Sequence, residues 1–190
     1  IVAEAVDTRS SENDCDVVIT RTWTFVDVCG NASQVSQLIT VKDNVAPVAP
    51  SAPADLTVAC IADVPVAATL TAIDNCSGEI VAEAVDTRSS ENDCDVVITR
   101  TWTFADDCGN ASSVSQTITV KDELAPEYVG NEPADITVAC ISEVPVAPTL
   151  TANDNCSGTV TGVVEDVTGG EGTCDVVITR TWTFADDCGN

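Results

Sequence analysis

Cysteines and aspartates are the residues of this sequence whose types and spacing could do chemistry. Ten cysteines recur at fixed places, and 31 acidic residues outnumber seven basic ones, which gives a net charge of −24. The sequence has no histidine and no CxxC pair, so neither a histidine-based nucleophilic site nor a zinc site is expected. We therefore expect disulfides, which imply an oxidising compartment. The negative charge argues against nucleic acid and anionic membrane surfaces as partners.

A long repeat organises these residues. Residues 1–43 match residues 80–122 at all but four positions, which fixes a period of 79, and the third copy is offset by 80. A repeat of this length is the size of a small domain. We expect the natural chain to continue in both directions. The predicted segments are the end of a first repeat at 1–43, a linker at 44–52, a complete repeat at 53–122, a linker at 123–132, and a third repeat without its last strand at 133–190.

Apolar and polar residues alternate with a period of two along each repeat, which predicts strands and no helix. In the complete repeat, two strands are expected to end at Cys60 and Cys76, a third spans 80–86, and a hairpin spans 94–122. The hairpin places Trp102 on one face and threonines on the other. The predicted fold is all-β: tandem immunoglobulin-like antiparallel β-sandwich modules joined end to end as a rod. One tryptophan per repeat is expected in the core of its module: Trp23, Trp102 and Trp182.

Three motifs carry a resemblance to a known family. The sequence contains TRTWTFADDCGN, TLTANDNCSG, and a recurring ITVKD that is followed two residues later by AP. These motifs resemble the HYR-like, immunoglobulin-like repeat modules of very large surface proteins of Bacteroidetes, including SprB-type gliding-motility adhesins. The resemblance covers the whole sequence. It implies export by the type IX secretion route and display on the surface of a Gram-negative cell.

Strand geometry narrows the disulfide connectivity. Cys94 and Cys108 flank one strand, so at about 3.3 Å per residue they lie on the order of 45 Å apart and cannot bond to each other. Each repeat has two ends, here called its poles, and successive strands run from one pole to the other. Following the strands predicts two disulfides within a repeat, one at each pole: Cys60–Cys94 and Cys76–Cys108. By repetition, Cys140–Cys174 and Cys156–Cys188 are expected in the third repeat. Cys15 and Cys29 are expected to pair with residues upstream of the sequence or, alternatively, with other chains.

Acidic residues gather at the pole where two repeats meet. Asp74 and Asp106 lie in turns at this pole, and the preceding repeat ends there at Asp43. Several carboxylates at a short linker suit Ca²⁺, which takes about six to eight oxygen ligands and would offset their repulsion. The alternative is ordinary turn formation, and Val28 stands where Asp107 stands in the next copy. The calcium hypothesis names as ligands Asp43, Asp74, Asp106 and Asp107 at the first junction, and Asp122, Glu123, Asp154, Asp186 and Asp187 at the second.

Other polar residues offer weaker signals. Arg100 shares a face with the tryptophan and could bind a ligand there. An internal ion pair with an acid of the strand 80–86, such as Glu83, is the simpler interpretation. Asn31 and Asn110 lie in Asn-x-Ser sequons, but they also lie in hairpin turns. The acidic residues recur from repeat to repeat, and catalytic sites are rarely repeated along a chain, so no enzyme is expected.

The predicted function is structural. We expect a non-enzymatic, extracellular repeat region of a large adhesin for gliding motility or surface attachment, which forms an extended disulfide-stapled filament. Its partners would be neighbouring repeats of the same chain and a surface polysaccharide or substratum. No cofactor other than Ca²⁺ is expected, and no apolar run is long enough to insert in a membrane. The alternative is a passive spacer in a secreted polysaccharide-degrading enzyme. A carbohydrate-binding module is disfavoured because one inward tryptophan forms no exposed platform.

Overall fold

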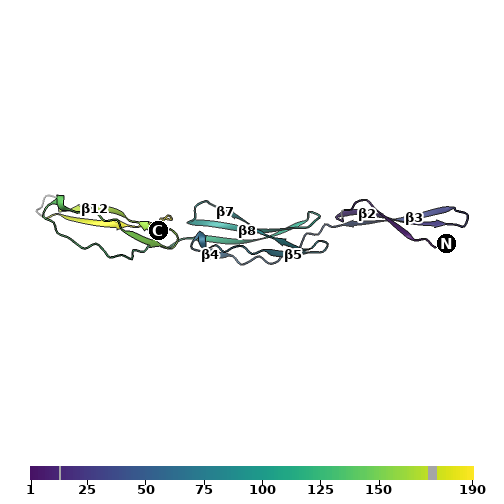
Figure 1. Cartoon of the computed structure of the whole chain (residues 1–190), viewed down its shortest axis with the longest axis horizontal. Helices are drawn as coiled ribbons and strands as arrows, with labels where there is room; N and C mark the ends of the chain where they lie inside the picture. The colour runs from purple at the N-terminus through teal and green to yellow at the C-terminus, as the bar shows by residue number, and fades with distance from the viewer. Residues whose placement is uncertain (13, 171–174) are drawn as a thin grey trace. The chain divides into compact units, whose positions relative to one another are not determined.

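The computed structural model describes residues 1–12, 14–170 and 175–190. Its regular structure is almost entirely strand, so the all-β prediction is confirmed. No helix in the described part of the chain is long and apolar enough to span a membrane. The described elements, several of which are labelled in Figure 1, are β1 (Ala5–Arg9), β2 (Asp16–Val26), β3 (Ala32–Lys42), β4 (Leu56–Val58), the 3-10 helix η1 (Ile61–Asp63), β5 (Leu70–Asp74), β6 (Gly78–Ala82), β7 (Ala84–Arg88), β8 (Asp95–Ala105), β9 (Ala111–Lys121), the 3-10 helix η2 (Ile141–Glu143), β10 (Thr151–Asp154), β11 (Gly158–Thr161), β12 (Val163–Gly169) and β13 (Val177–Thr183).

The period of two explains the long strands. In β8 every second residue from Val96 to Phe104 is buried, and the residues between them are exposed or half-exposed. β9 follows the same pattern from Gln116 to Val120. Alternation of this kind, rich in Val, Ile, Thr and aromatic residues, is typical of strands with one buried face.

The chain divides into two compact units, and each contains a junction between consecutive repeats. Unit 1 holds the junction at linker 44–52 and unit 2 the junction at linker 123–132. β8 and β9 run from one unit into the other. Unit 1 comprises Ile1–Pro53, Ala67–Val85 and Arg100–Ser115, and unit 2 comprises Ala54–Val66, Asp86–Thr99 and Gln116–Asn190.

Unit 1 combines the sheet β1-β2-β3 with the ladder β5-β6. Its core forms where Trp102 and Phe104 of β8 pack against Ala72 of β5 and Ala82 of β6. Trp102 is only 1% exposed, and its indole N–H donates a hydrogen bond to the backbone oxygen of Ala68 at 2.9 Å. The indole N–H of Trp102 therefore keeps a hydrogen-bond acceptor although the side chain is buried.

Unit 2 has a separate core on the other half of β8 and β9. It contains Val96, Ile98, Ile118 and Val120 as buried residues, covered by Leu56, Val58, Ile61 and Val64. The short strand β4 pairs with β9 in parallel orientation. The third repeat contributes the antiparallel ladders β10-β11 and β12-β13. Trp182 is half-buried, and its indole N–H donates to the Pro148 oxygen at 3.0 Å, in the manner of the second repeat.

Two features depart from the predicted strands. The strand expected at 80–86 is two strands, because β6 pairs with β5 whereas β7 pairs with β8, and the chain changes sheet at Glu83. The parallel pairing of β4 with β9 was not expected in an antiparallel fold. The structure consists of several small, mostly antiparallel sheets. The arrangement of immunoglobulin-like modules along a rod stays a prediction.

Candidate functional site at the repeat junctions

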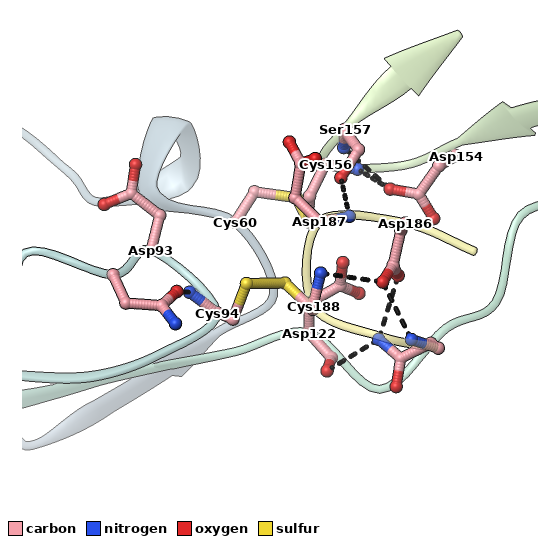
Figure 2. The surroundings of a disulfide bond; sticks show 12 residues. Cys60, Asp93, Cys94, Asp122, Asp154, Cys156, Ser157, Asp186, Asp187 and Cys188 are labelled. Carbon is pink, nitrogen blue, oxygen red and sulfur yellow. Dashed lines mark hydrogen bonds between the residues drawn. A yellow bond between two sulfur atoms is a disulfide. The ribbon is translucent and has the colours of Figure 1, made fainter. Parts of the chain in front are cut away.

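Three disulfides join cysteines of consecutive repeats. They are Cys15–Cys108 in unit 1, and Cys60–Cys156 and Cys94–Cys188 in unit 2 (Figure 2). Their Cα atoms are 5.1, 5.3 and 5.1 Å apart, within the range that a disulfide needs. The bonded cysteines are separated by 93, 96 and 94 residues, more than one repeat length. Each bond therefore crosses a junction.

This connectivity corrects the pairs predicted within a repeat. The structure contains none of Cys60–Cys94, Cys76–Cys108 and Cys156–Cys188 among its described residues. Strand length does keep Cys94 and Cys108 apart, but the partner of each lies in a neighbouring repeat. In unit 2 the end of the second repeat that carries two cysteines faces the end of the third repeat that carries two more. The bonds run across that junction.

Cys15 departs from its predicted pairing with an upstream residue, because its partner Cys108 lies downstream. Three other cysteines have no partner among the described residues. Cys29, Cys76 and Cys140 are free and exposed. The predicted partner of Cys140 is Cys174, which lies outside the described residues. The pairing of Cys29 with an upstream residue stays a prediction.

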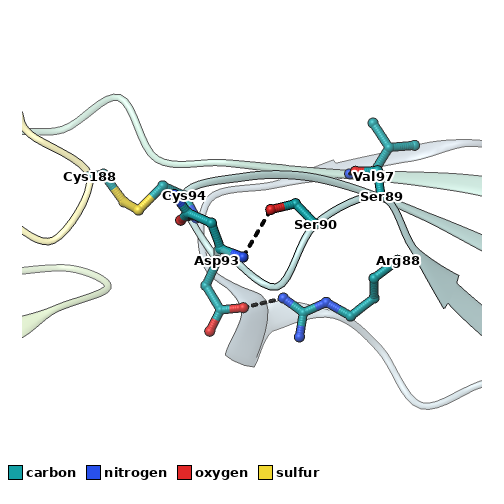
Figure 3. A network of polar contacts seen from close by, with 8 residues as sticks. Arg88, Ser89, Ser90, Asp93, Cys94, Val97 and Cys188 are labelled. Carbon is teal, nitrogen blue, oxygen red and sulfur yellow. Dashed lines mark hydrogen bonds and ion pairs between the residues drawn. A yellow bond between two sulfur atoms is a disulfide. The ribbon is translucent and has the colours of Figure 1, made fainter.

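A polar network in the loop before β8 positions Cys94 (Figure 3). Arg88 at the end of β7 forms an ion pair with Asp93. The backbone N–H of Asn92 donates to the Ser90 hydroxyl at 3.0 Å, and the Asn92 side-chain oxygen accepts the N–H of Cys94 at 2.8 Å. These bonds are local, so the loop presents the cysteine in a defined place.

The hairpin turn positions the second cysteine of the bridge. In unit 1, Oδ1 of Asp106 accepts the N–H groups of Cys108 and Asn110, both at 2.8 Å, and Oδ2 accepts the Asn110 amide at 2.8 Å. Gly109 completes the turn with a φ of 85°, a region that favours glycine. Desolvation raises the pKa of Asp106, but hydrogen bonds from Asn110 and the turn backbone outweigh it, so this pKa lies below its ordinary value. Asp186 repeats the arrangement in unit 2.

The two sequons lie in these turns, and their side chains are already engaged. The Nδ2 atom of Asn110, which glycosylation would modify, donates to Asp106 and, at 3.4 Å, to the backbone oxygen of Asp43. Nδ2 of Asn31 donates to Asp27 at 2.7 Å. A glycan at either position would displace the hydrogen bonds that hold the turn.

Both linkers dock on the repeat that follows. In unit 1, Val48 exchanges two backbone hydrogen bonds with Ile73 of β5, at 2.8 and 3.2 Å. In unit 2, Glu127 does the same with β10, at 2.8 and 2.9 Å. The next residue, Tyr128, stacks on Phe184 with the ring centroids 5.6 Å apart. Among the described residues, each junction thus has backbone pairing in addition to disulfide bonding, with one bond at the first junction and two at the second.

In unit 2 the structure brings together part of the predicted calcium set. One oxygen from each of three carboxylates lies within 4.8 Å of the others (Figure 2): Asp122, Asp154 and Asp186. The other two predicted ligands point elsewhere. Glu123 forms an ion pair with Lys121 at 2.5 Å, and Asp187 is exposed.

Unit 1 repeats two of these three carboxylates at the equivalent positions. Asp43 and Asp74 lie together with the thiol of Cys76, again within 4.8 Å. Desolvation raises the pKa of that thiol, and the two carboxylates raise it further. Of the other two predicted ligands, Asp106 holds its turn as Asp186 does but is not part of the unit 1 group, and Asp107 is exposed.

Asn155 lies in a turn that was expected at the acidic pole, but no role in the site was predicted for it. Its Nδ2 donates to Oδ1 of Asp122 at 3.3 Å and lies 3.4 Å from the sulfur of Cys60. It therefore links the acidic group to a disulfide. The signal in the sequence was the recurrence of Asp-Asn-Cys at 74–76 and 154–156, which was interpreted only as a turn.

The arginines make internal ion pairs. The copies of Arg100 each bind a carboxylate of the neighbouring strand through two hydrogen bonds of 2.7 to 2.8 Å: Arg21 with Asp7, and Arg180 with Asp166. Both acids stand at the position of Asp86 rather than Glu83, because Glu83 lies where the chain changes sheet. The hydrogen bonds raise the pKa of each arginine and lower that of its carboxylate partner. Arg100 itself is 5% exposed.

A pocket of about 700 Å³ lies in the third repeat, between residues 133–138 and residues 176–182. In the second repeat the equivalent segments contain β4 and β8, which flank β9. The pocket therefore corresponds to the place that a β9-like strand occupies. It is not a candidate ligand site.

The comparisons with known proteins give a family. Residues 1–41, 48–120 and 129–190 match a family model described as HYR-like domain with 4 cysteines. Neither the comparison with curated proteins nor the comparison with solved structures found a match.

Proposed function

The chain belongs to the family of HYR-like domains with four cysteines, and from this premise we propose that it is the repeat region of a large cell-surface adhesin. The family is a non-catalytic repeat family, and its disulfides fit an extracellular or surface module. In this proposal the repeats form an extended filament on a Gram-negative cell. The resemblance of the motifs to SprB-type adhesins supports gliding or attachment as the task and type IX secretion as the export route.

The observation that carries this proposal is a covalent route through the disulfides. The route crosses from Cys15 to Cys108, follows the segment that contains β8 back to Cys94, and crosses again to Cys188. The third disulfide, Cys60–Cys156, crosses the second junction alongside Cys94–Cys188. Tension on the chain can therefore pass from repeat to repeat along one strand and its bonds.

This route is much shorter than the polypeptide. From end to end it contains about 30 residues, whereas the chain contains 190. A pull on the oxidised chain cannot extend the remaining residues, even when every hydrogen bond of the repeats has broken. Such a chain transmits force with little gain in length. This property suits a tether between a cell and a surface, and a passive spacer has no use for it.

Single-molecule pulling on the two ends of the 190-residue chain tests this proposal. The oxidised chain is expected to reach a contour length of about 110 Å, because only the covalent route extends at roughly 3.5 Å per residue. After reduction the contour length rises to about 650 Å. Cys140→Ser is the matched control, because it removes an exposed free thiol and should leave the oxidised length unchanged.

Disulfides within repeats would give a different result. A chain with those bonds would extend to about 430 Å before reduction, because the junctions would remain open to stretching. That length in the oxidised chain contradicts the tether. A length of about 650 Å without reductant contradicts any disulfide on the route.

The adhesin role has its own test on cells that produce the protein. Antibodies against the oxidised chain are expected to label intact cells and to reduce their attachment to a polysaccharide-coated surface. Labelling confined to the medium, on a polypeptide with polysaccharide hydrolase activity, would overturn the adhesin in favour of the spacer.

A further inference from the structure

Asp122 and Asp154 at the second junction use only one carboxylate oxygen for local turns, whereas Asp186 uses both. Oδ1 of Asp154 accepts the N–H groups of Cys156 and Ser157 at 2.9 and 2.7 Å. Oδ1 of Asp122 accepts the N–H of Leu124 at 3.2 Å. Turn formation of this kind is common for aspartate. It accounts for one oxygen of Asp122 and one of Asp154 and leaves the other.

The first junction repeats this division. Oδ1 of Asp74 accepts the N–H groups of Cys76 and Ser77, both at 2.8 Å. Oδ1 of Asp43 accepts the N–H of Val45 at 3.2 Å. Two junctions, at equivalent positions of different repeats, thus hold the same pair of aspartates in the same way.

The second oxygen of each of these carboxylates is buried without a hydrogen-bond donor. The four atoms are Oδ2 of Asp43, Asp74, Asp122 and Asp154. Three of the side chains are buried, since Asp43, Asp74 and Asp122 are 9%, 5% and 6% exposed, and Asp154 is half-buried. Most buried carboxylate oxygens have a partner, because desolvation without one is costly. A buried, unpartnered oxygen in the same place at both junctions indicates a missing positive partner.

No basic side chain supplies that partner. The lysine that precedes each junction forms an ion pair with an acidic residue outside the cluster. Lys121 pairs with Glu123 at 2.5 Å, and Lys42 pairs with Asp16 at 3.9 Å. Among the described residues, none of the clustered aspartates has an ion-pair partner. Several negative charges therefore share a small buried space.

We propose that each junction binds one divalent cation of the calcium type. At the second junction Asp122 and Asp154 supply their unpartnered oxygens and Asp186 supplies a third carboxylate (Figure 2). At the first junction Asp43 and Asp74 supply the equivalent pair. A hard cation prefers oxygen ligands, and Ca²⁺ tolerates an incomplete protein set that water completes. This site rests on the junction geometry alone and is independent of the adhesin role.

The number of carboxylates sets the expected affinities. The second junction has three carboxylates within reach of one another and the first has two. Affinity for Ca²⁺ rises with ligand charge. The second junction is therefore the tighter site.

Calorimetric titration of the oxidised 190-residue chain with CaCl₂ tests the proposal. The chain is expected to bind about two Ca²⁺ in two affinity classes, one at each acidic group. Asp122→Asn with Asp154→Asn should remove the tighter class, and Asp43→Asn with Asp74→Asn the weaker. Asparagine keeps an oxygen for the turn N–H groups, so the loops should persist. Asp187→Asn, an exposed change in the same turn as Asp186, is the matched control and should keep both classes.

Two results would overturn the cation sites. One is the absence of Ca²⁺ binding to the native chain. The other is an equal loss of binding in Asp187→Asn and in the junction variants, which would indicate diffuse attraction to an acidic surface. Circular dichroism and disulfide mapping establish folding of each variant. If one double variant fails to fold, the other junction decides the question, because it carries the same pair of aspartates.

Discussion

Trp102 is the largest side chain in the hydrophobic core of unit 1. The indole is 1% exposed, packs on Phe104 and on alanines of β5 and β6, and satisfies its N–H with the Ala68 oxygen. The two alanines leave room for the ring. The core of unit 1 therefore contains two aromatic side chains, Trp102 and Phe104, packed on the alanines, and truncation of the indole would leave a space that the alanines cannot fill.

Truncation of this ring should be costly. Trp102→Ala is expected to lower the free energy of unfolding by about 3–5 kcal/mol, because it empties a large aromatic site. Denaturant titration with the disulfides intact measures the change. Trp23→Ala, at the half-buried equivalent in the first repeat, is the comparison and should cost less. Equal costs for the two substitutions would contradict the core described here.

The sequence identified which cysteines and aspartates belong to the site, but it did not identify the residues that they bond to or lie beside. Alternation in β8 placed Trp102 and Arg100 on one face, and recurrence placed the aspartates at a junction. Cys15 and Cys94 lie in identical stretches, SSENDCDVVITR, so no local pattern can tell which repeat supplies a partner. The repeat that supplies the partner depends on which poles of the repeats meet in the folded chain, and this is decided by tertiary structure. The orphaned carboxylate oxygens are likewise visible only once the loops have folded.

At the scale of elements, hairpins were predictable and sheet membership was not. The long strands β8 and β9 follow from an unbroken period of two, and the turn between them follows from Asp, Gly and Asn. The division between β6 and β7 interrupts no sequence pattern, because only the pairing partner changes. β4 has three residues and pairs in parallel, so its orientation depends on where the linker leaves it.

The turn between β2 and β3 carries a prediction for pH. Hydrogen bonds from the Asn31 side chain and backbone are the main reason that the pKa of Asp27 lies below its ordinary value. A carboxylate whose pKa is lower in the folded state stabilises the fold above its ordinary pKa, and this contribution is lost as the pH falls through the folded-state value. Asp27→Asn should therefore reduce stability at pH 7, and the difference from the native chain should shrink below about pH 4.

Unfolding curves at pH 7 and at acidic pH measure this effect. Asp63→Asn, which removes the same charge from an exposed position, is the control. A deficit for Asp27→Asn that is the same at both pH values would show that the substitution acts through something other than the ionised carboxylate.

At the scale of the whole molecule, disulfides rather than a large hydrophobic core hold consecutive repeats together. Each bond closes a loop of 93 to 96 residues. In the chain-entropy model a loop of about 100 residues is worth about 4.7 kcal/mol, more than the loops of some thirty residues that bonds within a repeat would close. The bonds that cross a junction thus stabilise the folded units and also make the repeats one covalent series.

Peptide mapping of the unreduced protein tests that connectivity most directly. Trypsin releases residues 181–190, TWTFADDCGN, which contain Cys188 alone, and residues 122–180, which contain Cys140, Cys156 and Cys174. We predict that residues 181–190 are linked to the peptide SSENDCDVVITR. That peptide arises from both Cys15 and Cys94, so the link must survive in Cys15→Ser, whereas the link to the peptide of Cys108 must disappear. A bond between 181–190 and 122–180 would place the disulfide within one repeat and contradict the covalent crossing of the junctions.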